Sequence, residues 1–174
     1  SNISASASGG LYGKTLSNQS SNITFTSNSF SSWSTGKINT FYAPLLELDV
    51  RMSNADNVKD IVVYFKTNEG GSTEYSMSVN EYAFIKYDYS GKYEHMLYLP
   101  MYAHANWGDS ETRYVTDLRI EIIPEDGKTL SGDFALSYVR PSLDTRHTNN
   151  NSIYISSLRQ DYDYTGDLAF LEQN

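Results

Sequence analysis

The segment LLELDVRM, from Leu45 to Met52, decides the fold class that this sequence predicts. Every second residue in it is apolar: Leu46, Leu48, Val50 and Met52. The residues between them are charged: Glu47, Asp49 and Arg51. A period of two is typical of a β-strand that buries one face. We therefore predict a strand whose apolar face lies in a core and whose charged face is solvated, because acidic side chains are seldom buried.

Other segments have the same character. Asp60–Thr67 is more continuously apolar, as expected of a central strand. Two segments alternate: Thr116–Ile123, with Leu118, Ile120 and Ile122 inward, and Gly132–Arg140, with Phe134, Leu136 and Tyr138 on one face. Further predicted strands are Leu11–Leu16, Asn22–Thr26, Thr73–Val79, Tyr82–Tyr87 and Tyr93–Leu99. Strands separated by turns, with no helical crossovers, predict an all-β fold, an antiparallel β-sandwich of the jelly-roll type.

The character of the sequence changes after Pro141. Ile155, Leu158 and Tyr162 have helical spacing, and Asp167 can cap a second helix. We therefore divide the chain into a sandwich domain, residues 1–140, and a linker with a helical tail, residues 141–174. The tail is expected to be the start of a following domain, and the alternative is a C-terminal helix packed on the sandwich.

Composition excludes several classes of function. The chain has 174 residues, the length of one domain, and it contains no cysteine, which excludes disulfides and thiolate metal sites. Its net charge is -8 and its pI about 4.7, whereas nucleic-acid binding normally needs a basic face. Its apolar runs are much shorter than the roughly 18 residues of a membrane span. We expect no nucleic-acid partner and no membrane association.

Three segments resemble β-sandwich modules found beside bacterial glycoside hydrolase domains. They are LLELDVRM (Leu45–Met52), IVVYFKTNEGG (Ile61–Gly71) and NWGDSETRYVTDLRIEIIPEDGKTLSGDFALSYVR (Asn106–Arg140). The last is similar to a pattern of Trp, a polar spacer, "I-x-x-L-R-I-x-P" and "G-x-x-x-I-D-Y-I-R". This resemblance implies a carbohydrate-binding-module-like jelly roll in an extracellular or cell-surface protein. Ser137 stands where many relatives have an Asp that supports a structural calcium ion.

The tail, Ser142–Asn174, is similar to the entry into an (α/α)-barrel glycoside hydrolase domain. There a "D-T-R…N" loop leads to one helix and "T-G-D-x-x-F-L" opens the next, as at Asp144–Arg146 and Thr165–Leu171 here. With the three segments above, the resemblance covers about the last three-quarters of the chain. It implies an adjacent catalytic domain in the parent protein.

The residues themselves offer no recognisable catalytic site or cofactor motif. Glycoside hydrolysis needs two carboxylates facing each other, and Glu47 with Asp49 are more simply solvated surface acids. A G-x-S-x-G nucleophile motif is absent from the sequence. His95, His104 and His147 are too scattered for a zinc motif, and His95 is expected to be a hydrogen-bonded core residue. The candidates for a structural calcium ion are Glu125, Asp126 and Asp133.

Loop aromatics are the candidate binding residues. A pyranose ring offers an apolar C–H face and a rim of hydroxyls, so its site needs flat aromatic rings beside polar side chains. Trp33 lies in a polar loop that offers it no core role, whereas for Trp107, in the strand-entry motif, packing is favoured over stacking. The candidate carbohydrate-binding residues are Trp33, Tyr42, Tyr87, Tyr102, Trp107 and Arg113.

We therefore expect a monomeric, non-catalytic carbohydrate-binding module of a secreted bacterial glycoside hydrolase, with a plant-type polysaccharide or oligosaccharide as its partner. The first alternative is a structural sandwich that supports the adjacent catalytic domain without binding sugar, and it predicts loop aromatics that are buried or disordered. A jelly-roll enzyme or lyase would need a groove of clustered Tyr, His, Arg and carboxylates. An adhesin-like protein-binding domain would need a flat apolar patch.

Overall fold

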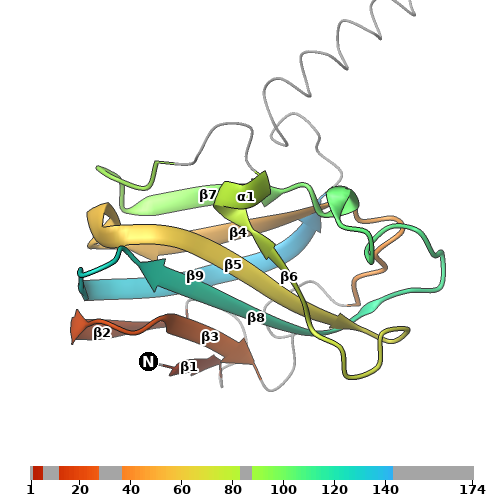
Figure 1. Ribbon diagram of the computed structural model, residues 1–174, viewed down its shortest axis with the longest axis horizontal. Coiled ribbons are helices and arrows are strands. Elements are labelled where there is room, and N and C mark those ends of the chain that lie inside the picture. The colour runs from red at the N-terminus through yellow and green to blue at the C-terminus, as the bar shows by residue number, and fades with distance from the viewer. Residues whose placement is uncertain (1, 6–11, 28–36, 83–87, 143–174) are drawn as a thin grey trace, which may run out of the picture. The chain divides into compact units, whose positions relative to one another are not determined.

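The strands form two facing sheets (Figure 1). A computed structural model of the chain describes residues 2–5, 12–27, 37–82 and 88–142. The five-stranded sheet has the order β1-β3-β8-β5-β6, and the four-stranded sheet has the order β2-β9-β4-β7. The strands are β1 (Asn2–Ala5), β2 (Tyr12–Gln19), β3 (Ile23–Ser27), β4 (Leu45–Met52), β5 (Val58–Thr67), β6 (Tyr75–Ser78), β7 (Glu94–Leu99), β8 (Val115–Pro124) and β9 (Leu130–Ser142).

Strand pairing is nested along the chain. The innermost pair is β5 with β6, and β4 pairs with β7, β3 with β8 and β2 with β9, all antiparallel. The strand β1 is added at one edge, parallel to β3. Helical structure in the described residues is limited to three single turns: η2 (Ala55–Asn57), α1 (Val79–Tyr82) and η3 (Met101–Ala103). The prediction of an all-β sandwich is confirmed.

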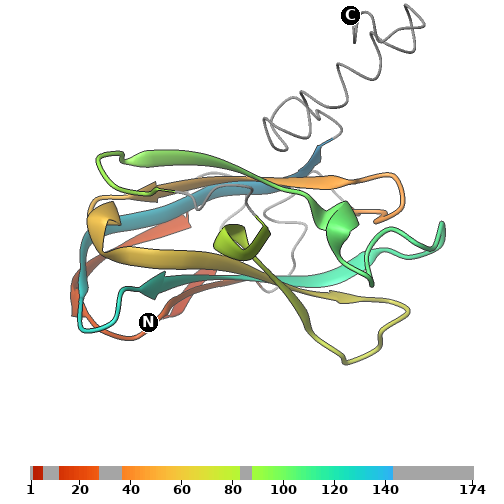
Figure 2. The same cartoon turned by 45° about the horizontal axis from the view of Figure 1, so that its top comes forward.

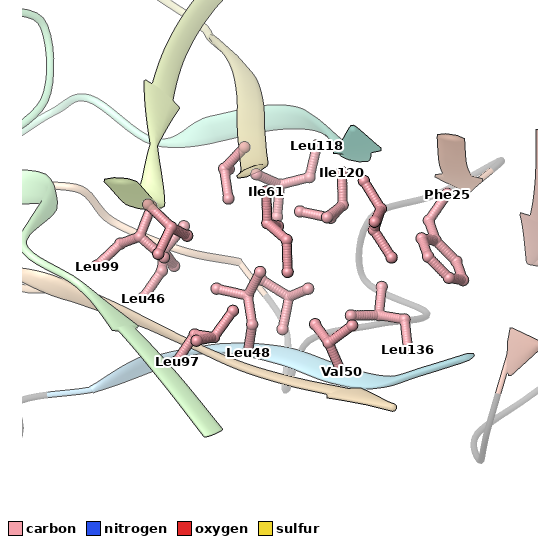
Figure 3. Packing of buried hydrophobic residues seen from close by; sticks show 14 of the residues in the cluster. Phe25, Leu46, Leu48, Val50, Ile61, Leu97, Leu99, Leu118, Ile120 and Leu136 are labelled. Carbon is pink, nitrogen blue, oxygen red and sulfur yellow. The ribbon is translucent and has the colours of Figure 1, made fainter. Parts of the chain in front are cut away.

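One hydrophobic core lies between the two sheets. Figure 2 shows the sheets facing each other, and Figure 3 shows part of the core. Leu46, Leu48, Val50 and Met52 of β4 lie in it beside apolar residues of β5, β8 and β9. Ten labelled members are Phe25, Leu46, Leu48, Val50, Ile61, Leu97, Leu99, Leu118, Ile120 and Leu136. All of them are at most 2% exposed. The predicted inward residues of Leu45–Met52 and Thr116–Ile123 are therefore confirmed.

A β-bulge changes which side chains of the last strand point into the core. Phe134 and Leu136 are buried as predicted, but Tyr138 is not on their face. The pairing of β9 with β4 shifts between Asp49 and Val50, which pair with Tyr138 and Leu136. Ser137 is the extra residue, so the alternation restarts after it and Val139 points into the core. The prediction for Tyr138 is wrong because alternation alone does not reveal a bulge.

Several predicted boundaries move. The strand β2 continues to Gln19, and β6 covers only Tyr75–Ser78 of the predicted Thr73–Val79 strand. Of the predicted strand Tyr82–Tyr87, Tyr82 ends α1 and the other residues lie outside the described ones. The strand β9 runs to Ser142, two residues beyond the predicted domain limit. The predicted helical tail also lies outside the described residues.

Gly132 provides a test of the packing between β9 and the turn after β4. Its φ is +93°, and an added Cβ would lie 2.7 Å from the Cβ of Ser53. Ser53 cannot easily withdraw, because its backbone N–H donates to the Asp133 carbonyl at 2.8 Å. We expect Gly132→Ala to lower the free energy of unfolding by roughly 2–4 kcal/mol, from backbone strain and overpacking together.

Gly127→Ala is the matched control for that measurement. Gly127 also has a positive φ, +76°, but its Cβ would meet no atom within 4 Å. Gly127→Ala should therefore lose stability through backbone strain alone, without a steric clash. The urea denaturation midpoints of the two variants then give the contribution of the clash with Ser53. Equal destabilisation by both variants would contradict the close packing against Ser53.

Candidate functional site

The described parts of the β3–β4, β5–β6 and β7–β8 loops lie at the same end of the sandwich, on the right in Figure 1. Antiparallel pairing places them there, because each follows a strand that ends at that side. Their described parts are residues 37–44, 68–74 and 100–114. Two Asn side chains connect them: Asn39 donates to the Glu111 carbonyl at 2.9 Å, and Asn68 donates to the Thr112 carbonyl at 3.2 Å.

Arg113 holds the β5–β6 and β7–β8 loops together. Its guanidinium donates to Glu69 at 3.2 Å and to the Trp107 carbonyl at 3.3 Å, and it also pairs with Asp109. Hydrogen bonds from Ser110 and Thr112 lower the pKa of Glu69. The Arg113 side chain is only 12% exposed. Arg113 was predicted to contact sugar, but the structure commits its guanidinium to the loops.

The turn after Asn39 is held at three points. The Asn39 side-chain oxygen accepts from the Phe41 N–H at 3.0 Å, which forms an Asx-turn. The Thr40 N–H donates to the Arg113 carbonyl at 3.1 Å. The Trp107 indole N–H donates to the Ala43 carbonyl at 2.7 Å. The backbone that carries Phe41 and Tyr42 is thus fixed to the neighbouring loop.

Trp107 is a packing residue. It is fully buried, and its ring lies edge-on to Phe65, with the centroids 5.0 Å apart. Phe65 also contacts Tyr75 and His104, and burial lowers the pKa of that histidine. The Trp107 ring has no face open to a ligand, so of its two interpretations the structure selects packing. Its indole N–H explains the need for Trp at this position.

Three exposed aromatic side chains lie on the loops that Trp107 joins. In the described part of the chain, five large hydrophobic side chains are exposed: Phe41, Tyr42, Tyr93, Met96 and Tyr102. Phe41 is 42% exposed, Tyr42 is 61% and Tyr102 is 51%. The Tyr102 N–H donates to the Pro44 carbonyl at 3.1 Å, so η3 borders the turn that carries the other two rings. We call Phe41, Tyr42 and Tyr102 the aromatic rim.

The structure thus brings four of the six predicted binding residues to one end. Tyr42 and Tyr102 are exposed there. Trp107 and Arg113 form hydrogen bonds with the backbone of the loops that carry them. Trp33 and Tyr87 lie outside the described residues. Phe41 was missed by the sequence reasoning, although its place beside Tyr42, ahead of Pro44, is the signal of an exposed turn.

The three predicted calcium ligands have separate surroundings. Asp126 pairs with Lys59 at 3.2 Å, and Asp133 accepts from the Thr15 hydroxyl. Glu125 is partly buried in the β8–β9 turn. Within the described ranges, no three His, Asp or Glu side chains gather in the arrangement of a metal site.

The acidic face of β4 is not solvated, contrary to the prediction. Glu47 is 7% exposed and Asp49 is 4% exposed. Three long side chains from the flanking strands bind Glu47: Arg140 donates two hydrogen bonds of 3.1 Å, Tyr138 one of 2.9 Å and Tyr98 one of 3.4 Å. The guanidinium of Arg140 also lies over the Tyr138 ring. Covered in this way, a carboxylate can lie on the outer face of a sheet and still be buried.

Glu47 and Asp49 have opposed pKa shifts, a pattern that acid–base catalysis uses. Burial alone would raise the pKa of Glu47, but its bonds to Arg140 and Tyr138 outweigh this and lower it. Burial raises the pKa of Asp49, and Glu94 raises it further. Both oxygens of Glu47 are nevertheless occupied, and both residues point from one strand to one side. They do not face each other as a catalytic pair does, so we interpret Glu47 as a structural link between β7, β4 and β9.

No protein-family model matches the chain, and no curated protein matches its sequence significantly. Of the helices that the structure describes, none has the length and apolar character needed to cross a membrane.

The Glu47 network predicts a pH dependence of stability. A carboxyl group whose pKa is lowered by folding stabilises the fold above its unfolded pKa, near 4.5, and this contribution is lost as the pH falls through the lower folded pKa. We expect Glu47→Gln to lower the free energy of unfolding at pH 7 by about 1–3 kcal/mol. Its deficit should shrink toward pH 3, in urea denaturation from pH 7 to 3.

Asp126→Asn is the control, because the Asp126 side chain is 92% exposed and its pair with Lys59 lies in water. It should follow the wild-type profile closely. A Glu47→Gln variant as stable as the wild type at pH 7 would show that the network does not stabilise the sheet.

Proposed function

We propose that this domain is a non-catalytic carbohydrate-binding module of a secreted bacterial glycoside hydrolase, and that it binds plant-type polysaccharide at the aromatic rim. The observation that carries the proposal is the exposure of Phe41, Tyr42 and Tyr102 on two loops joined by a backbone hydrogen bond. An aromatic ring stacks on the apolar C–H face of a pyranose, and a Tyr hydroxyl can also donate to or accept from a sugar hydroxyl.

The hydrogen bonds that fix the backbone of the rim favour a binding role over incidental exposure of its rings. Exposing large apolar side chains brings no stability, yet the backbone under Phe41 and Tyr42 is fixed by Asn39, Arg113 and Trp107. A loop already held in one conformation loses less entropy when a ligand binds. The rim therefore has the rigid anchors that a recognition site needs.

We further propose that the sandwich is a jelly roll. The nested pairs β2 with β9, β3 with β8, β4 with β7 and β5 with β6 support this topology. Apart from β1, which is an addition at one edge, the eight strands form two sheets of four, as in a jelly roll. This fold agrees with the module type that the sequence resembles.

A structural domain that supports an adjacent catalytic domain is the second candidate. The observation that favours it is that Trp107 and Arg113, two of the predicted binding residues, are committed to packing and to loop contacts. It predicts that the aromatic rim contacts protein and binds no glycan.

Affinity electrophoresis of the 174-residue chain tests the proposal. Native gels that contain xylan, xyloglucan, mixed-linkage β-glucan or galactomannan should retard the protein on at least one glycan. Tyr42→Ala and Tyr102→Ala should each weaken that binding about tenfold, or about 1.4 kcal/mol, as expected for an aromatic anchor. Trp33→Ala, run in the same gels, tests whether that predicted residue contributes.

Tyr93→Ala is the matched control. Tyr93 is 48% exposed, and its carbonyl accepts from Met52 at the far end of β4 from the rim, roughly 25 Å away at the rise of a strand. This variant should bind as the wild type does. Absence of retardation on every glycan would refute binding, and retardation unchanged in both rim variants would remove the rim as its site.

A further inference from the structure

We propose that the aromatic rim binds a single neutral polysaccharide chain and neither the flat face of a crystalline polysaccharide nor a polyanionic one. This inference rests on the proposed function and specifies its ligand. Two features of the rim carry it: the angle between its adjacent rings, and the charges of the loops that surround them.

The rings of Phe41 and Tyr42 form a corner. Their centroids are 5.1 Å apart and their planes are inclined by 80°. A crystalline surface presents sugar rings in one plane, so several aromatic rings can stack on it only when they are themselves coplanar. Two rings at nearly a right angle cannot both do so. They can, however, enclose one chain, with the face of a sugar on one ring and its edge against the other.

The conformation of the loop holds the two rings at this angle. The Phe41 N–H donates to the Asn39 side chain, and the two backbone groups that flank the pair, Thr40 N–H and the Ala43 carbonyl, bond to Arg113 and Trp107. The backbone therefore cannot turn to bring the rings into one plane. A change of side-chain rotamer would give up the edge-to-face contact, which is a favoured arrangement of aromatic rings.

The charges around the rim disfavour an acidic glycan. The described parts of the three loops contain two cations, Lys37 and Arg113, and four carboxylates, Glu69, Glu74, Asp109 and Glu111. Glu74 is paired with Arg119 of β8, which leaves Glu69, Asp109 and Glu111 against the two loop cations. Arg113 pairs with Glu69 and Asp109, and the Lys37 ammonium lies 3.6 Å from the centre of the Tyr114 ring. Both cations are thus engaged within the loops, and a uronate chain would meet net negative charge.

Parallel binding measurements on the full chain test this inference. Depletion onto microcrystalline cellulose, and affinity electrophoresis in neutral glycans and in homogalacturonan, should be compared at one protein concentration. We expect binding to at least one soluble neutral glycan, and at least tenfold weaker binding to crystalline cellulose and to homogalacturonan. Phe41→Ala should weaken the neutral binding several-fold by opening the corner, whereas Phe41→Tyr, which keeps the ring, should preserve it.

The outcomes separate this inference from the proposal beneath it. Equal or tighter binding to crystalline cellulose or to homogalacturonan would overturn the single neutral chain and leave the module proposal standing. Equal binding by Phe41→Ala and the wild type would overturn the corner as the cause of selectivity. Absence of binding to every glycan would refute the proposed function itself. Because Phe41 is exposed, we expect both variants to fold, and circular dichroism melting of each checks this.

Discussion

Burial of two apolar sheet faces against each other is the constraint on which the rest of the structure depends. Leu48 in one sheet and Ile120 in the other are both fully excluded from water, and they belong to one core. A slip of one residue in any central strand would expose its whole apolar face, so the core determines the register of every pairing. With register and topology determined, the β3–β4, β5–β6 and β7–β8 loops meet at one end, and that end carries the aromatic rim.

The same constraint explains the buried carboxylates on the outer face of the four-stranded sheet. The inward side chains of β4 force Glu47 outward, between the neighbouring strands β7 and β9. The bulge at Ser137 places Tyr138 on that outer face, where its hydroxyl reaches Glu47 together with Arg140. The carboxylate loses water but gains hydrogen bonds from charged and phenolic donors, which offset its desolvation. Opposed pKa shifts on one strand can therefore record a structural network and not a catalytic pair.

Trp107 connects the core to the rim. Its ring packs on Phe65 inside the sandwich, and its indole N–H bonds to the backbone of the turn that exposes Phe41 and Tyr42. One side chain thus transmits the rigidity of the core to the surface loop. Residues of this kind share the aromatic composition of a binding site without contacting a ligand, and only burial separates the two roles.

The amino-acid sequence alone determined the all-β class and the inward residues of β4 and β8, because period-two alternation is a local property of a half-buried strand. It also pointed to Tyr42 and Tyr102 as loop aromatics. Tertiary structure decided what depends on partners distant in the chain. It placed the bulge that turns Tyr138 outward, and it buried Glu47 and Asp49. It also gave Trp107 and Arg113 a packing role, in contrast to the exposed rings at the same end. The physical reason is that a side chain's burial is set by the strands and loops beside it. In the contacts of Trp107 and Glu47 these come from residues 64 and 93 positions away.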